Sequence, residues 1–308
     1  MFGKSRQSFH QMEKRRLKTS VEEEIVLVYV REIRKQMPRI GVRKLHFMLQ
    51  DILQSNHIKL GRDKFFNLLR THNLLVRPRR RRVKTTYSNH LYWKYPNLIR
   101  DYVPTGPEQI WVSDLTYLST ENGFVYLSLV TDQYSKKIMG YYVSPTLAAS
   151  GPLEALKMAF NNREHLDTKL IHHSDRGIQY CCEEYISILK KYTVSISMSS
   201  KGNPYENAVA ERVNGILKTE FYLDRFFRDI NQVHSVVKSV ISIYNSNRPH
   251  ASCDNLTPQQ AHEGAGILKK RWKVYKPKKD MKEPEPIGEE VKRAIKQLLK
   301  KEYTSVDN

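Results

Sequence analysis

Residues 109–132 read QIWVSDLTYLSTENGFVYLSLVTD, and this stretch decides the fold class. Apolar and polar residues alternate over residues 110–119, as expected of a β-strand that buries one face. The dipeptide Asn122-Gly123 then gives a strong hairpin signal, and residues 124–131 predict the returning strand. A β-hairpin is therefore expected at the centre of the chain.

Downstream of this hairpin the periodicity changes several times. It predicts strands at residues 138–144, 169–173 and 194–198, and helices at residues 150–162, 178–191 and 206–220, followed by a further helix over apolar positions 233–244. The order βββαβαβα is the order that a ribonuclease-H-like fold requires. We therefore predict an α/β domain over residues 109–265, with a mixed five-stranded sheet and flanking helices.

Three acidic residues fall on separate elements of this predicted domain. Asp114 lies on the first strand, Asp175 just after the fourth, and Glu211 on the last core helix, with 35 residues between Asp175 and Glu211. Carboxylates at strand ends and on a facing helix can converge and form a cage for two divalent metal ions. Two such ions clamp the attacking and leaving oxygens of a phosphoryl transfer. Asp114, Asp175 and Glu211 are therefore the candidate catalytic and metal-ligating residues, with two Mg²⁺ ions expected and Mn²⁺ as a substitute.

The charge of the chain points to a polyanionic partner. The formal net charge is +20, and it is unevenly distributed: residues 1–100 carry 24 Lys and Arg against 7 Asp and Glu. Residues 101–265 carry 15 against 18, so the predicted core is close to neutral. Nucleic acid is the expected partner, bound mainly through the flanks of the core. Basic flanks that only aid solubility are the alternative.

Composition excludes several other classes of protein. The longest apolar run, residues 25–30, is far shorter than the about 20 residues that a membrane span needs. Neither a secretory signal nor a G-x-x-x-x-G-K-[ST] phosphate loop is found in the sequence. Three cysteines, two of them adjacent, give no disulfide framework. A cytoplasmic protein without a membrane partner is therefore expected.

Residues 1–84 are predicted to form a helical DNA-binding domain of helix-turn-helix type. Helices are expected at residues 20–36, which a Ser20/Glu23 capping box would start, at about residues 42–53, and at about residues 62–72. Gly61-Arg62-Asp63-Lys64 opens the third helix, where side chains can meet phosphates or base edges. A plain helical bundle without DNA contacts is the alternative.

An arginine-rich run closes this domain. Its basic residues, expected to track phosphate oxygens, are Arg77, Arg79, Arg80, Arg81, Arg82 and Lys84. A solvated linker is the other interpretation of the run. Residues 85–108 are interpreted as a linker that also touches DNA, and residues 266–308 as a basic tail with a short amphipathic helix at residues 289–301.

Several strings together resemble one known family over nearly the whole chain. They are WVSDLTYLS, LVTDQYS, HHSDRGIQY, GNPYENAVAERVNGILKTE and YNSNRPH followed by LTP. They resemble the OrfB-type transposases of bacterial insertion sequences, in the DDE superfamily with retroviral integrases. Two positions depart from the family pattern: Glu206 stands where an aspartate is usual, and Cys253 where a leucine is usual.

The resemblance implies an integrase-type catalytic core and a DNA transposase. Such an enzyme nicks the ends of its element and joins the 3′-hydroxyl to target DNA. It implies that Lys218, seven residues after Glu211, holds phosphate near the cut. It also implies a homo-oligomer on DNA in the bacterial nucleoid, and an upstream-frame (OrfA-type) product or fusion as partner. The start of the chain resembles the tail of a recognition helix, which suggests that the fused form supplies the rest.

Helical spacing places Asn207, Glu211 and Lys218 on one face of the last core helix, so Asn207 is a second candidate DNA contact there. His172 and His173 precede Asp175 and could orient it or contact phosphate, whereas Asp132 is expected to be structural. Residues 202–204 are interpreted as a mobile loop over the site.

Two other functions stay open from the sequence. One is a ribonuclease-H-like nuclease that hydrolyses DNA without strand transfer. The other is a non-catalytic DNA-binding regulator or a degenerate relic.

Overall fold

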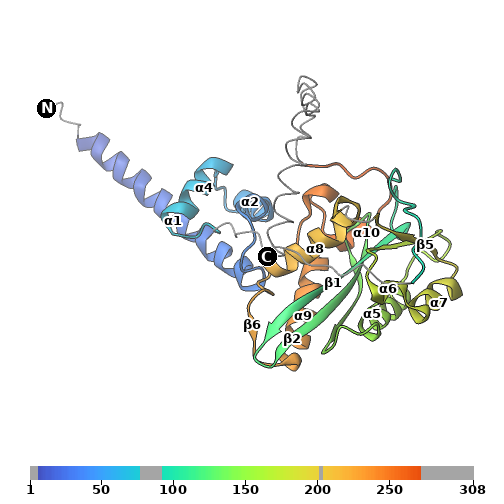
Figure 1. Ribbon diagram of the computed structural model, residues 1–308. Helices are drawn as coiled ribbons and strands as arrows, with labels where there is room; N and C mark the ends of the chain where they lie inside the picture. Colours follow the sequence, from blue (N-terminus) through green and yellow to red (C-terminus); the bar gives the residue numbers. More distant parts are fainter. Residues whose placement is uncertain (1–5, 77–91, 201–203, 272–308) are drawn as a thin grey trace, which may run out of the picture. The chain divides into compact units, whose positions relative to one another are not determined.

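A mixed β-sheet forms the centre of the protein in the computed structural model, which describes residues 6–76, 92–200 and 204–271 (Figure 1). The main strands run in the order β3-β2-β1-β4-β5, and β6 pairs with the far end of β1. Strands β1 to β3 are antiparallel, while β4, β5 and β6 run parallel to their neighbours. The strands are β1 (Ile110–Thr120), β2 (Gly123–Asp132), β3 (Ile138–Ser144), β4 (Ile171–Ser174), β5 (Ser195–Met198) and β6 (Phe226–Phe227).

The predicted hairpin is confirmed. Thr120 pairs with Gly123, so Glu121 and Asn122 alone form the turn. Gly123 adopts a φ of +112°, which a residue with a Cβ reaches only under strain, and this explains the glycine at the turn. All five predicted strands are present within two residues of their expected bounds. Strand β6 was not predicted, because two residues are too short to show a period.

Helices cover both faces of the sheet. On one face, side chains of β1 and β2 share a hydrophobic cluster with α8 and α9. On the other face, Trp111 and Met139 pack with α5 and α7. The helices of the core are α5 (Ser150–Asn161), α6 (Ile178–Cys181), α7 (Glu183–Lys191), α8 (Ala208–Thr219), α9 (Ile230–Asn247) and α10 (Pro258–His262), with 3-10 turns η1 (Pro204–Asn207) and η2 (Ala251–Cys253). This is the ribonuclease-H-like fold class that the sequence predicts.

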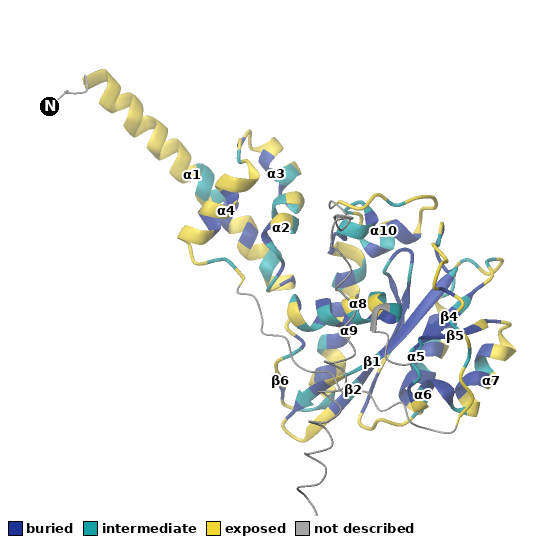
Figure 2. Cartoon of the chain, turned by 45° about the horizontal axis from the view of Figure 1, so that its top comes forward, coloured by how far each residue is buried: buried dark blue, intermediate teal, exposed yellow. Residues whose placement is uncertain are grey.

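The N-terminal region is helical, as expected, but its first helix is much longer. It consists of α1 (Arg6–Gln36), α2 (Val42–Met48), α3 (Gln50–Ser55) and α4 (Arg62–Thr71). The predicted helix start at Ser20 is wrong, because Ser20 lies in the middle of α1. No glycine or proline interrupts residues 6–20, and most of them are good helix formers, so the helix continues through the capping signal. Figure 2 shows this first half of α1 exposed on the described surface.

Two helices predicted as continuous are divided in two. Residues 42–53 break at Leu49, between α2 and α3, and residues 178–191 break at Cys182, between α6 and α7. Cys182 adopts an extended backbone (φ −66°, ψ 151°) and becomes the N-cap of α7. Neither break lies at a glycine or proline, so residue type gives no signal for it.

Several predicted features lie outside the described residues: the arginine-rich run at residues 77–84, positions 202–203 of the loop ahead of η1, and the helix at residues 289–301. Among the helices that are described, none is long and apolar enough to cross a membrane.

Candidate active site

Asp114 and Asp175 are brought together by the pairing of two parallel strands. Ile110 pairs with Ile171 and Val112 with His173, so β1 and β4 are in register. Continuing this register by two residues sets Asp114 level with Asp175. Neighbouring strands lie about 4.8 Å apart, and residues two apart on a strand share one face. The two carboxylates therefore belong to the same face and the same end of this strand pair.

Helix α8 packs on that face and carries Glu211. Ala210 and Val209 contact Ile110 and Val112 in one buried cluster, which fixes the start of the helix against β1. Glu211 follows Ala210 directly and is half-buried rather than fully exposed. The third carboxylate thus comes from an element that packs on the strand bearing Asp114, as the sequence indicates.

Two asparagines fasten α8 to β1 on either side of Glu211. Asn207 donates through Nδ2 to the carbonyl oxygen of Ser113 at 3.0 Å. Asn214 donates through Nδ2 to Oδ2 of Asp114 at 2.9 Å. Positions four before and three after Glu211 lie on its side of the helix, so we expect Glu211 to face β1 near Asp114.

These contacts change the interpretation of Asn207 and give Asn214 a role that was not predicted. Asn207 is buried and bonds to the core, so its place in the fold is to anchor α8, and a DNA contact by it stays a prediction. Asn214 was missed from the sequence, although a signal exists: a polar residue stands between Val213 and Ile216, in the apolar part of the helix pattern.

The segment after β4 holds Asp175 in a tight turn. The backbone N–H of Gly177 donates to Oδ1 of Asp175 at 2.9 Å. A Cβ on Gly177 would lie only 3.0 Å from that same oxygen, so a glycine suits the turn. The nearby Tyr180 hydroxyl is buried, and its pKa is raised by burial first and then by Tyr185, Asp114 and Asp175. Both aspartates therefore raise the pKa of the same tyrosine. This agrees with the register of β1 and β4, which sets the two residues at one end of the strand pair.

His172 and His173 support the site from inside the core. The Nε2 atom of His172 lies 2.7 Å from the Ser113 hydroxyl and 3.0 Å from the Tyr185 hydroxyl. The Nδ1 atom of His173 lies 2.8 Å from the Ser197 hydroxyl. Burial lowers the pKa of His172 to about 3 and that of His173 to about 4, so both rings are neutral at pH 7. The two buried rings thus connect β1, β4 and β5, and a phosphate contact by either stays a prediction.

Glu206, the first departure from the family pattern, lies just before α8 and contacts Ser200 and Arg100. Its carboxylate accepts a hydrogen bond from the backbone N–H of Ser200 and lies 3.4 Å from Arg100. The Ser200 N–H is the main cause that lowers the pKa of Glu206 to about 2. A glutamate is therefore compatible with an ordered start of η1 and α8.

The far end of α8 is fixed by Arg248, from the predicted Arg-Pro-His motif. Arg248 is buried and donates to both carboxylate oxygens of Glu220, through Nε at 2.9 Å and Nη2 at 3.0 Å. Lys44 donates to the same carboxylate at 2.8 Å. Two parallel hydrogen bonds of this kind stabilise the ion pair of Arg248 with Glu220, because the geometry of the guanidinium matches that of the carboxylate. The helix that carries Glu211 is thus held at both ends.

The donor set around Asp114 fits Mg²⁺ or Mn²⁺. Carboxylate oxygens are the ligands that hard divalent cations prefer, and two or three of them leave room for water and substrate phosphate. In addition, the buried Oδ1 atoms of Asn207 and Asn214 accept no hydrogen bond from any described residue. Such oxygens can accept hydrogen bonds from the water shell of an ion. The residues present are therefore suited to such a cation.

A second group of potential ligands within the described residues is Glu164, His165 and His262. The imidazole of His262 is already engaged: its Nδ1 lies 3.1 Å from the Ser135 hydroxyl, and its Nε2 lies 3.2 Å from Glu108. Of the three residues only His262 is buried, and it belongs to a structural network inside the core. Asp132, which was expected to be structural, is part of it and accepts hydrogen bonds from the backbone of Glu108 and Ser135.

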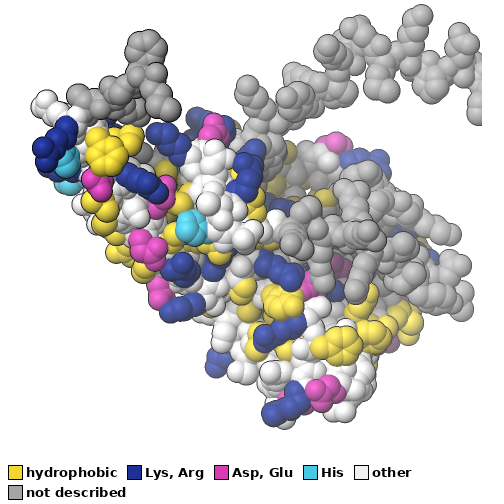
Figure 3. Space-filling view, turned by 90° about the vertical axis from the view of Figure 1, so that its left-hand side faces the viewer, with side chains coloured by type: hydrophobic (Ala, Val, Ile, Leu, Met, Phe, Trp, Pro, Cys, Tyr) yellow, Lys and Arg dark blue, Asp and Glu magenta, His cyan; other side chains and the backbone are white. Residues whose placement is uncertain are grey.

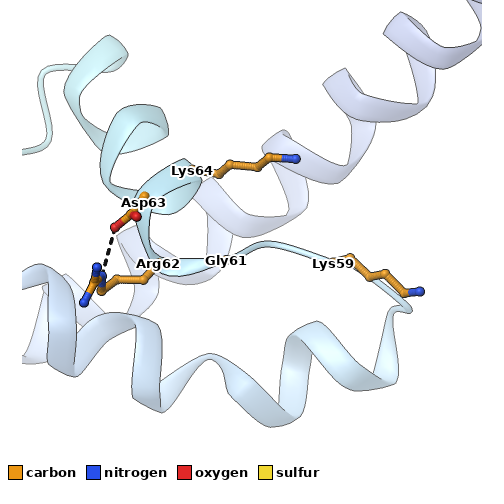
Figure 4. Close-up of a pocket in the computed structure, with 5 residues that line it drawn as sticks. All are labelled: Lys59, Gly61, Arg62, Asp63 and Lys64. Carbon is orange, nitrogen blue, oxygen red and sulfur yellow. Dashed lines mark hydrogen bonds and ion pairs between the residues drawn. The ribbon is translucent and has the colours of Figure 1, made fainter.

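Basic side chains on the helical region offer places for DNA to contact. A pocket at the start of α4 is lined by Lys59, Gly61, Arg62, Asp63 and Lys64. Arg62 is turned back onto Asp63 at 2.9 Å, whereas the Lys59 and Lys64 side chains extend away from that pair (Figure 4). Figure 3 shows Lys and Arg side chains spread among exposed hydrophobic ones on one side of the molecule. A DNA contact at the pocket stays a prediction.

Comparison with known families matches residues 104–204 and, separately, residues 192–258 to integrase core domains. The uncharacterized 31 kDa protein of insertion element IS600 from Shigella sonnei is 37% identical over 217 residues, covering 70% of this chain and 79% of that protein. Transposase InsF for insertion sequence IS3A from Escherichia coli (strain K12) is 34% identical over 194 residues, covering 62% of this chain and 67% of that protein. Among solved structures, the catalytic core domain of HTLV-2 integrase is matched with a TM-score of 0.42 at 18% identity, over 52% of this chain and 99% of that chain, a likeness too low to bear on function.

Proposed function

Because the chain belongs to the insertion-sequence transposases of the DDE superfamily, we propose that it is a metal-dependent transposase that nicks the ends of its own element and transfers the 3′-hydroxyl to another DNA. The observation that carries this proposal is the arrangement of three carboxylates. Asp114 and Asp175 each lie two residues beyond the last β1–β4 pair, Val112 with His173, and Glu211 lies in sequence between the two asparagines that hold α8 to β1.

In this proposal Asp114, Asp175 and Glu211 are the catalytic residues and hold two Mg²⁺ ions, for which Mn²⁺ can substitute. When bound there, the ions would activate the attacking oxygen and neutralise charge on the leaving oxygen of the cut phosphodiester. The chain's own residues provide the placement. Asn214 orients Asp114 through its 2.9 Å hydrogen bond, and the turn at Gly177 holds Asp175.

Lys218 is proposed to bind a phosphate close to the cut. It lies seven residues, or two helical turns, after Glu211 on α8 and is half-buried. An ammonium at this distance along the helix can hold the DNA backbone while the carboxylates act on the next phosphate. The buried, neutral His172 and His173 are proposed to keep the strands in register and to take no part in proton transfer.

The basic flanks are proposed to supply most of the DNA affinity. The contacts would come from the helical region and from Arg77, Arg79, Arg80, Arg81, Arg82 and Lys84. Specific recognition of both ends is proposed to need more than one copy of the chain, and an upstream-frame product or fusion. A ribonuclease-H-like nuclease without strand transfer remains the second candidate, since the same carboxylates could activate water alone.

Cleavage and joining must be measured separately to decide between these functions. The substrate is a labelled terminal fragment of the element with Mg²⁺, and products are resolved by size on a denaturing gel. A transposase gives both nicked ends and longer joined products. Nicked ends without joined products, also when a pre-cut 3′-hydroxyl end is supplied, would favour the nuclease and contradict the proposal.

A further inference from the structure

The edge strand β5 is bordered by residues 92–100, the segment that leads into the core. The backbone N–H of Met198 donates to the carbonyl oxygen of Pro96 at 3.2 Å, and the N–H of Leu98 donates to the Ser197 hydroxyl at 2.9 Å. In Figure 1 this segment, coloured teal, runs beside β5. This part of the predicted linker is therefore fixed to the sheet.

The segment borders the end of the sheet where two of the carboxylates lie. Met198 pairs with Ser174, the residue before Asp175. The Cys181 thiol lies 3.7 Å from Sδ of Met198, so the turn after Asp175 contacts the same residue of β5. Pro96, which is hydrogen-bonded to Met198, therefore lies one strand away from the Asp175 turn, on the outer side of β5.

The residues just before this anchor lie close to the same turn. Tyr95 packs against the hydrophobic cluster that contains Cys181. Burial raises the pKa of the Cys181 thiol to about 11, and the charges of Asp175 and Lys94 act on the same thiol with opposite sign. Lys94 and Asp175 are therefore both close to Cys181, although they come from distant parts of the chain.

Trp93 is exposed next to Lys94. Its side chain is 77% exposed, although the large apolar surface of a tryptophan is usually buried on folding. Lys94 is exposed as well. The side chain of Arg100 further along the segment is 65% exposed and lies 3.4 Å from Glu206, ahead of α8. The segment thus presents a ring together with cationic side chains.

An exposed ring among cations suits single-stranded nucleic acid. Bases without a pairing partner stack on aromatic side chains, and the phosphates between them attract lysine and arginine. The charge of the chain favours this occupant, because residues 1–100 carry 24 Lys and Arg against 7 Asp and Glu.

We propose that Trp93 stacks on an unpaired DNA base near the cut, while Lys94 contacts a phosphate beside that base. This inference rests on the proposed function, because DNA that reaches Asp114 and Asp175 must pass the end of the sheet that this segment borders. Removing the ring should weaken the binding of single-stranded DNA about five- to a hundredfold, the scale of one base stacked on an aromatic side chain.

The test compares the affinity of the whole chain for a single-stranded thymine oligonucleotide and for a fully paired duplex. Trp93→Ala should lose most affinity on the single strand, because paired bases are not free to stack, and Trp93→Phe should keep most of it. Lys94→Ala should weaken both and flatten the salt dependence by about 0.7 on the single strand. Phe226→Ala, at a residue that is also 77% exposed but lies on β6 at the far end of β1, is the matched control.

Tryptophan emission gives a second readout that does not depend on activity. Stacking on thymine should quench Trp93, and the difference between the wild type and Trp93→Phe separates its emission from that of the other two tryptophans. Equal losses of affinity in Trp93→Ala on the single strand and on the duplex, or in Trp93→Ala and Phe226→Ala, would overturn the stacking role.

The two proposals fail in different ways. A wild-type chain that cuts and joins DNA, while Trp93→Ala binds the single strand with unchanged affinity, would overturn the stacking role and leave the proposed function. A wild-type chain whose Trp93 is quenched by the oligonucleotide, but which neither cuts nor joins DNA, would overturn the proposed function and leave the stacking contact.

Discussion

The side-chain amide of Asn214 donates a 2.9 Å hydrogen bond to Oδ2 of Asp114. This bond joins the helix of Glu211 to the strand of Asp114, and it leaves Asp114 with a fixed orientation. A buried hydrogen bond to a charged group is worth about 1.5–3 kcal/mol. Through Asn214, α8 therefore orients the carboxylate of Asp114, which is proposed to be catalytic.

Asn214→Ala is expected to slow end cleavage by about ten- to a hundredfold, if that free energy is lost in the transition state. The Mg²⁺ concentration for half-maximal cleavage should rise, because Asp114 is no longer oriented, while DNA affinity should hardly change. Cleavage rates over a Mg²⁺ series, with gel-shift affinity beside them, measure both. Asn162→Ala, which removes a hydrogen bond to the Met139 carbonyl far along the chain, is the control. An unchanged Mg²⁺ requirement in Asn214→Ala would contradict this role.

The free energy of unfolding should decrease as the pH is lowered below about 6.5, because His172 is buried and neutral in the folded protein. Its pKa is about 3 in the folded protein, lowered by burial, against 6.5 in the unfolded chain. Between these values the unfolded state binds more protons, so the free energy of unfolding decreases as the pH falls, by up to about 1.4 kcal/mol per pH unit. The contribution is fully present above pH 6.5. Urea unfolding at pH 7.0, 6.0 and 5.0 measures it.

His172→Gln removes this titration, so its unfolding free energy should depend less steeply on pH than that of the wild type. His234→Gln, at an exposed position, should keep the wild-type slope. If the unfolding free energies of His172→Gln and the wild type changed with pH in parallel, the buried His172 ring would not be the cause of the pH dependence.

Two glycines should respond to alanine in opposite directions. A Cβ on Gly140 would clash with the carbonyl oxygen of Ala155 and lie 2.6 Å from the backbone nitrogen of Ala159, so β3 and α5 would have to separate. Gly140→Ala should lower the free energy of unfolding by about 1–3 kcal/mol. Gly215 on α8 has nothing within 4 Å of such a Cβ, and Gly215→Ala should raise stability by about 0.5–1 kcal/mol. Urea titrations that rank the two variants the other way would refute this packing.

Replacing Arg79, Arg80, Arg81 and Arg82 with alanine should weaken binding about equally on all DNA sequences. Each phosphate contact contributes about −0.9 to the slope of log K against log salt, so the salt dependence should flatten. Binding titrations at several salt concentrations, on an element end and on random DNA, test this. Loss of affinity for the element end alone would mean that the run reads bases.

The arrangement of the core could be predicted from sequence because each signal is local. The alternation around Asp114 and the Asn122-Gly123 signal indicate the hairpin, and the order of strands and helices then predicts that Asp114, Asp175 and Glu211 converge. Helix starts were less predictable. The capping signal at Ser20 was overridden because the residues before it are themselves good helix formers, so α1 begins at Arg6.

Contacts between distant residues could not be predicted in this way. The hydrogen bond from Asn214 to Asp114 spans 100 residues, and the contact between Lys218 and Tyr117 joins a helix to a strand. Both depend on how α8 is packed on β1, which no local pattern encodes. The burial of His172 and His173, which favours a structural role for both, likewise could not be predicted from the local sequence.

The claim that Asp114, Asp175 and Glu211 hold the metal ions is tested most directly by changing each to cysteine and comparing cleavage in Mg²⁺ and Mn²⁺. A thiolate is a poor ligand for Mg²⁺ and a better one for Mn²⁺. We expect each variant to lose roughly a hundredfold or more of its activity in Mg²⁺ and to recover part of it in Mn²⁺, while Asp167→Cys, at an exposed position, cuts like the wild type in both. Cleavage at the wild-type rate in Mg²⁺ by any of the three variants would contradict the account.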